Sequence, residues 1–123
     1  MSKTILTVDD SRTMRDMLLM ALTDAGFRVV QAVDGQDGLQ VLEAHADEID
    51  VIITDINMPR LDGFGFIENV RKNDDHRATP ILVLTTESDG SKKDRARQAG
   101  ATGWIVKPFN PVKLVEAIRR VAA

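Results

Sequence analysis

The chain has 123 residues, a length that fits one domain able to bury a core without a disulfide or a structural metal. It contains no cysteine, which excludes thiol catalysis, disulfides and cysteine-ligated zinc or iron–sulfur sites. The formal net charge is −3, a balance that argues against nucleic-acid binding. No apolar run approaches the roughly 20 residues that span a bilayer, and no secretory signal opens the chain, so we expect a cytoplasmic protein without a membrane segment.

Short apolar runs alternate with amphipathic segments along the chain. The first apolar run, Thr4–Val8, is followed by Arg12–Ala25, where apolar residues recur at helical spacing. Ser11 is a suitable N-cap for that helix, and Gly26 is a suitable residue to end it. In chain order, we expect further strands at Arg28–Ala32, Val51–Thr54, Ile81–Thr85 and Gly103–Val106, and further helices over Asp34–Ala46, from Gly63, over Asp89–Ala99 and from Pro111.

This order repeats a βα unit five times, which is typical of a parallel sheet with helices on both faces. Strands that are apolar throughout, without alternation, indicate burial on both sides. We therefore predict an α/β fold of the flavodoxin-like, doubly wound type, with five strands in the order 2-1-3-4-5 and five helices. We expect residues 1–123 to form a single domain with no output domain. Ligands bind such sheets beyond the carboxyl ends of the strands.

Polar residues follow four of the five predicted strands. Asp9 and Asp10 follow the first strand, Asp55 follows the third, Thr85 ends the fourth and Lys107 follows the fifth. Each has an ordinary explanation alone, since aspartate caps helices and lysine is commonly solvated. Their placement on one edge of a parallel sheet nevertheless indicates a functional site.

Three carboxylates at one edge would raise one another's pKa unless a cation compensates them. Mg²⁺ prefers oxygen ligands and retains several waters, so it suits such a site, and Lys107 can balance a further charge. We expect the two histidines, His45 and His76, to lie at the surface away from this edge, which argues against zinc or copper. The sequence thus predicts a magnesium site at Asp9 and Asp10, completed by a phosphate.

The same residues fit phosphoryl transfer to a carboxylate. Asp55 stands alone after the central strand and faces the acidic pair, so it is the best candidate nucleophile. Such a reaction needs positioning and neutralisation of phosphoryl oxygens, which Mg²⁺, the Lys107 ammonium and the Thr85 hydroxyl can supply.

Four segments carry a resemblance to a known family: "VDDS", "ITDINMPRLDG", "VLTT" and "AGATGWIVKPF". In order and spacing they resemble the receiver domain of two-component response regulators over nearly the whole chain, most closely the stand-alone chemotaxis regulators of the CheY type. The resemblance implies a signalling phosphoacceptor that catalyses its own phosphotransfer and dephosphorylation and is not otherwise an enzyme.

The resemblance also implies residue roles. Asp55 would accept a phosphoryl group from a phosphohistidine on a sensor histidine kinase. Asp10 and Asp55 would bind Mg²⁺ directly together with the backbone carbonyl of Asn57, and Asp9 would act through water. Lys107 would contact the phosphoryl group.

A switch is implied next to this site. Thr85 would turn its hydroxyl toward the phosphate, and an aromatic residue would move inward behind it. Trp104 stands at the aromatic position, where the family more often has tyrosine or phenylalanine. Asn57 and Glu87 would tune dephosphorylation, and their combination resembles short-lived motility regulators.

The family's output surface corresponds here to the fourth helix, fifth strand and fifth helix. We expect a monomer whose partners are a chemotaxis-type kinase and either the flagellar motor switch protein or a phosphatase. A phosphate sink or a phosphorelay intermediate is the alternative role. The predicted fourth helix offers Lys92, Lys93, Arg95 and Arg97 to an acidic partner. Leu19 and Met20 lie off the main apolar face of the first helix and could help dock the kinase.

Two other functions fit the topology less well. A flavodoxin-like electron carrier would need a hydroxyl- and glycine-rich phosphate loop after the first strand, where this chain has two carboxylates. A phosphatase of the haloacid-dehalogenase type would need a D-x-D pair, which "TDINM" does not supply.

Overall fold

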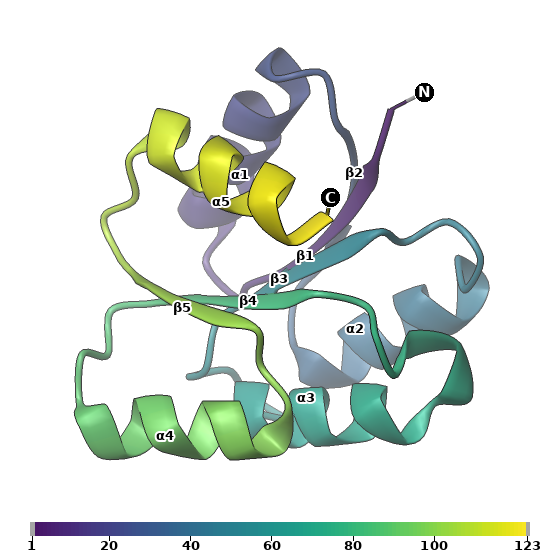
Figure 1. The fold of residues 1–123 in the computed structure, drawn as a ribbon, viewed down its shortest axis with the longest axis vertical. Helices are drawn as coiled ribbons and strands as arrows, with labels where there is room; N and C mark the ends of the chain where they lie inside the picture. Colours follow the sequence, from purple (N-terminus) through teal and green to yellow (C-terminus); the bar gives the residue numbers. More distant parts are fainter. Residues whose placement is uncertain (1, 123) are drawn as a thin grey trace.

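The computed structural model describes residues 2–122, and it has the predicted doubly wound architecture (Figure 1). Five parallel strands form one sheet in the order β2-β1-β3-β4-β5. The strands are β1 (Thr4–Val8), β2 (Arg28–Ala32), β3 (Val51–Thr54), β4 (Ile81–Thr85) and β5 (Gly103–Val106). The helices are α1 (Arg12–Asp24), α2 (Gly35–Ala44), α3 (Gly63–Lys72), the short 3-10 helix η1 (Asp74–His76), α4 (Gly90–Ala99) and α5 (Pro111–Ala122).

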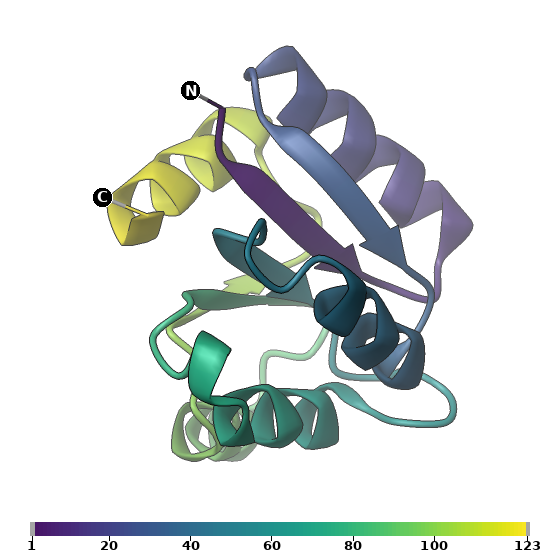
Figure 2. The same cartoon turned by 90° about the vertical axis from the view of Figure 1, so that its right-hand side faces the viewer.

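Helices cover both faces of the sheet. Helices α1 and α5 lie on one face, and α2, α3 and α4 lie on the other, as the two perpendicular views show (Figures 1 and 2). Each face has its own apolar core. On β1, Leu6 and Val8 contribute to the core under α2 and α3, while Ile5 contributes to the core under α1 and α5. This two-sided burial explains why the strand sequences are apolar throughout.

The predicted helix boundaries were right to within one or two residues, and local capping explains the differences. Helix α2 begins at Gly35 because the Asp34 side chain accepts the Asp37 N–H as an N-cap. Asp89 likewise caps α4 and is not its first residue. Helix α1 begins at Arg12, as predicted, and Ser11 is its N-cap. The 3-10 helix was not predicted.

The expectation that His76 lies at the surface is wrong. Its side chain is 1% exposed, with Nδ1 3.0 Å from the Thr79 hydroxyl and Nε2 without a hydrogen-bond partner. The cause is Arg71, whose guanidinium donates to the carbonyls of His76, Thr79 and Gly100 and so draws the loop after α3 onto the end of α4. His45, by contrast, lies at the end of α2 with an accessible side chain, as expected.

Leu19 and Met20 are exposed on α1, at 38% and 69% of their surface. Within residues 2–122, no helix combines the length and the apolar character needed to cross a bilayer.

Candidate metal and phosphoacceptor site

The three predicted acids meet at the carboxyl edge of the sheet. Strands β1 and β3 are neighbours, with Val8 opposite Thr54, so the residues that follow them emerge side by side. Carboxylate oxygens of Asp9, Asp10 and Asp55 all lie within 4.8 Å of one another. The topology of the sheet thus creates a compact acidic cluster from loops that are far apart in sequence.

Lys107 reaches this cluster from the end of β5. Its Nζ lies 2.9 Å from Oδ2 of Asp9 and 2.8 Å from Oδ2 of Asp55, and its side chain is only 10% exposed. Burial by itself lowers the pKa of Lys107, but the hydrogen bonds and charges of Asp55 and Asp9 outweigh burial and raise that pKa. The lysine is therefore held as a cation between two carboxylates.

The acids differ in their surroundings. Asp9 is 2% exposed, and its Oδ1 accepts the Ser11 N–H at 2.8 Å, while Asp10 is exposed to solvent. Burial raises the pKa of Asp9, although the Ser11 N–H and Lys107 oppose that shift. Asp55 has one oxygen on the Ile56 N–H and the other on Lys107. The exposed carboxylate of Asp10 is thus the most accessible of the three to a cation from solvent.

The remaining predicted residues converge on Glu87 in the loop after β4. Its N–H donates to the buried Thr85 hydroxyl at 3.3 Å, and its carbonyl accepts the indole N–H of Trp104 at 3.2 Å. Its carboxylate accepts the Asn57 amide at 3.2 Å and pairs with Lys92 at 3.1 Å. One residue therefore connects the loop beside the acids, through Asn57, with β5 and α4.

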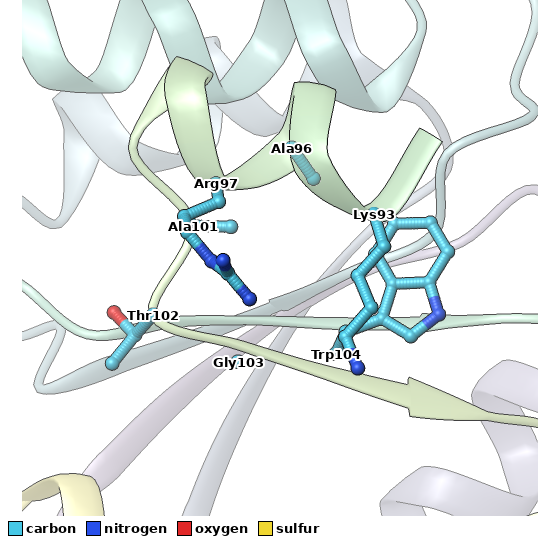
Figure 3. A pocket seen from close by; sticks show the side chains of 7 residues that line it. All are labelled: Lys93, Ala96, Arg97, Ala101, Thr102, Gly103 and Trp104. Atoms are coloured by element: carbon cyan, nitrogen blue, oxygen red, sulfur yellow. The ribbon is translucent and has the colours of Figure 1, made fainter. Parts of the chain in front are cut away.

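A cavity of about 60 Å³ lies between α4 and β5, beside Trp104 (Figure 3). Trp104 forms one wall, and the cationic side chains of Lys93 and Arg97 extend over it from α4. The rest of the lining is small and comes from Ala96, Ala101, Thr102 and Gly103. The indole therefore borders a hollow on the surface where the family's output face is expected.

Sequence reasoning did not predict other ion pairs at this edge of the sheet, such as the pair of Glu87 with Lys92 and that of Asp34 with Arg60. The stretch after β2 contains Asp34, which binds the Arg60 side chain from the β3–α3 loop. The Asp-Gly dipeptide at Asp34 was a signal for a helix N-cap, but nothing local indicated an ion pair across 26 positions.

A doubly wound sheet with an acid–lysine cluster at its carboxyl edge defines the receiver class of two-component signalling domains. The profile of the response regulator receiver domain matches residues 5–119, and the chain belongs to this family. Within it, the chain is similar to chemotaxis proteins. CheY1 of Helicobacter pylori is 37% identical over 118 residues, which cover 95% of this chain and 94% of CheY1.

Solved structures agree with this assignment. The chemotaxis protein CheY4 of Vibrio cholerae has a TM-score of 0.92 and 44% identity, with 98% of this chain and 99% of that chain covered. A second similar structure is the receiver domain of a Pseudomonas aeruginosa sensor histidine kinase, which has a magnesium ion coordinated in its active-site cleft. Its TM-score is 0.87 and its identity is 26%, and the match covers 99% of this chain and 98% of that chain. The chain also matches longer proteins and spans 44–47% of the length of ycf27 relatives.

Proposed function

We propose that Asp55 accepts a phosphoryl group from a phosphohistidine of a sensor histidine kinase. An Asp55 oxygen forms the new bond to phosphorus while the bond from phosphorus to the histidine nitrogen breaks, and the released imidazole takes up a proton. The observation that supports this role most strongly is the position of Asp55, which is nearly buried within the acidic cluster and has the Lys107 Nζ at 2.8 Å.

The donor set at this edge fits Mg²⁺. Three carboxylates and one ammonium leave a formal charge of −2, and every side-chain donor is a hard oxygen atom. Asp10, Asp55 and the Asn57 carbonyl would hold the ion directly, and Asp9 would do so through water. When bound, Mg²⁺ supplies positive charge that offsets the negative charge of the phosphoryl group.

The chain's own residues would complete the binding of the phosphoryl group. The Lys107 ammonium already lies against the acceptor oxygen, so it can remain close to the phosphoryl oxygens once the acyl phosphate forms. The Thr85 hydroxyl, which now accepts the Glu87 N–H, would turn toward the phosphate. That rotation breaks one of the hydrogen bonds that hold the loop after β4. Because Glu87 also contacts Trp104 and Lys92 of α4, the change would be transmitted to both.

The output of this switch would be the surface formed by α4, β5 and α5. Arg95 is engaged against the Phe64 ring, with 4.1 Å from its guanidinium carbon to the ring centroid, whereas Lys93 and Arg97 flank the cavity beside Trp104. A partner that carries acidic side chains would suit this surface. We propose a cytoplasmic monomer that binds the flagellar motor switch protein or a phosphatase in this way.

The test is phosphotransfer from the cognate kinase with labelled ATP, with and without Mg²⁺. Wild type should gain acid-labile label only when Mg²⁺ is present, and Asp55→Asn should gain none while keeping its fold. Asp74→Asn, which changes an exposed aspartate of η1, is the matched control and should label normally. Label on Asp55→Asn would assign the acceptor to another residue.

A phosphorelay or phosphate-sink role is the second candidate, because a receiver domain of a sensor histidine kinase is among the similar structures. The two roles differ in the fate of the label. A motor regulator would bind the motor switch component and lose its phosphate quickly, in keeping with Asn57 and Glu87. A relay intermediate would pass the label to a second histidine, and a lifetime of many hours would contradict the short-lived state.

A further inference from the structure

The loop between β3 and α3 contains a tight turn with an unusual backbone. The Leu61 N–H donates to the Pro59 carbonyl at 2.7 Å, and the residue between them, Arg60, has a φ of +66°. This is a γ-turn of the rare, strained type. Among residues 2–122, no other residue except glycine has a positive φ. The conformation is strained for a residue that has a Cβ, so the local hydrogen bond needs support from interactions elsewhere.

The Arg60 side chain supplies such an interaction. Its Nε lies 2.7 Å from Oδ2 of Asp34 and its Nη2 lies 3.0 Å from Oδ1, so the pair forms a two-point fork. Asp34 is 4% exposed and also caps α2 by accepting the Asp37 N–H at 2.8 Å. The fork therefore fixes the tip of the β3–α3 loop to the start of α2.

Backbone contacts limit where the loop can go. The Gly35 N–H donates to the Leu61 carbonyl at 3.1 Å, and a Cβ on Gly35 would overlap that oxygen. At the other end, the Gly63 N–H donates to the Ile56 carbonyl at 2.8 Å. The loop is thus held at its base by α3 and at its tip by α2, and Asn57 lies on the stretch between these two attachments.

We propose that the Arg60–Asp34 fork is a positioning clamp for the divalent cation, because it holds the loop that supplies the Asn57 carbonyl. This inference rests on the proposed function, in which that carbonyl is a ligand. Neither side chain of the clamp touches the acidic cluster, so both act through the backbone. Removing the clamp lets the strained turn at Arg60 relax, and this shifts the Asn57 carbonyl earlier in the same loop. Partners that hydrogen-bond metal ligands change metal affinity by about 10- to 100-fold, and we expect the low end of that range here because the clamp acts through the backbone.

The experiment is a Mg²⁺ titration followed by backbone amide chemical shifts in wild type, Arg60→Asn, Asp34→Asn and the double variant. Asparagine tolerates positive φ and also caps helices, so Arg60→Asn adds no new strain of its own at position 60 and Asp34→Asn keeps a cap on α2. We expect about tenfold weaker binding in each single variant and no further loss in the double variant. Arg77→Asn, which breaks an exposed pair with Asp74, is the matched control and should bind as wild type does.

Each outcome decides between the alternatives. Single variants that bind Mg²⁺ like wild type, or losses that add in the double variant, would overturn the clamp while leaving the metal site intact. Urea denaturation without Mg²⁺ measures whether a variant has only lost stability. A folded variant with lowered stability but unchanged Mg²⁺ affinity would also overturn the clamp. Wild type that shows no Mg²⁺ response would remove the proposed metal site itself.

Discussion

Lys107 and Asp55 are separated by 52 positions in the chain, and Nζ of the lysine lies 2.8 Å from Oδ2 of the aspartate. Both side chains are about nine-tenths buried. Asp9 shares the same ammonium at 2.9 Å. The lysine therefore compensates two carboxylates that would otherwise be buried without an opposite charge, and it links β5 to the two strands at the centre of the sheet.

The change Lys107→Met should destabilise the domain in the absence of divalent ions. It leaves Asp9 and Asp55 without their cation, so we expect the free energy of unfolding to fall by about 2 kcal/mol in EDTA. Mg²⁺ should restore more stability to this variant than to wild type, because binding to the folded state adds stability. Urea denaturation with EDTA or with Mg²⁺ measures both effects. Lys113→Met, an exposed change on α5, should leave stability within about 0.5 kcal/mol of wild type, and an equal loss there would contradict the assignment.

The acid–lysine cluster could be predicted from sequence because parallel topology decides it. Once the strand order is fixed, residues that directly follow the strands lie at the same edge. Asp9 and Asp55 follow the adjacent strands β1 and β3, and the long Lys107 side chain reaches them from β5. The fold followed from the alternation of apolar runs and helical spacing, and helix ends followed from capping residues such as Ser11. Apolar periodicity and capping residues depend on neighbours in the sequence, so the helices and strands that they predict are the same in the folded domain.

The fork between Arg60 and Asp34 could not be predicted in this way. It depends on how two loops lie against each other, and neither residue has a neighbour that indicates a partner 26 positions away. The burial of His76 was missed for the same reason, since Arg71 organises that loop through carbonyl groups that any sequence provides. Side chains that join separate loops are where sequence patterns carry least information.

The change Asp10→Asn should weaken Mg²⁺ binding while sparing the fold. Asp10 is the exposed member of the cluster, so removing its charge leaves the Lys107 pairs with Asp9 and Asp55 intact. We expect at least tenfold weaker binding, about 1.4 kcal/mol, and stability in EDTA equal to or slightly above that of wild type, because one repulsion is lost. Amide shifts during a Mg²⁺ titration give the affinity. Asp24→Asn at the end of α1 is the matched control, and similar losses in both variants would argue against a direct ligand.

Trp104 is the only tryptophan in the chain, so its fluorescence can test the proposed switch without a signal from a second indole. Its indole N–H donates to the Glu87 carbonyl, and the Glu87 N–H donates to the Thr85 hydroxyl. A phosphoryl mimic such as beryllofluoride with Mg²⁺ should shift the emission, and Thr85→Ala should reduce that shift by at least half. Thr86→Ala, one residue further and exposed, should respond like wild type. A full response in Thr85→Ala would show that the threonine does not couple the site to Trp104.

The Arg60–Asp34 fork should also make stability depend on acidity. The Arg60 hydrogen bond holds the pKa of Asp34 below its ordinary value of 3.8. The ionised carboxylate is therefore favoured in the folded state, and its contribution is present above the unfolded-state pKa and lost as the pH falls through the lower folded-state pKa. Wild type should be more stable than Asp34→Asn at about pH 6, and the difference should shrink steadily once the pH drops below about 4. Urea denaturation across this range measures it, and a constant difference would rule out the ionised pair as its source.

His76 should cause a second loss of stability on acidification, in a higher pH range than the loss that Asp34 causes. Burial lowers its pKa below the ordinary value of 6.5, with nearby Arg71 acting in the same direction and Asp75 and Asp47 opposing it. The unfolded chain therefore takes up the proton first, so stability is complete above about pH 6.5 and declines as the pH falls toward the folded-state pKa. The change His76→Phe keeps an aromatic ring in the buried position and should flatten this slope between about pH 7.5 and 5.5. His45→Phe, at an accessible histidine, is the control and should keep the wild-type slope in the same urea titrations. A slope that is unchanged in His76→Phe would show that another group takes up the proton.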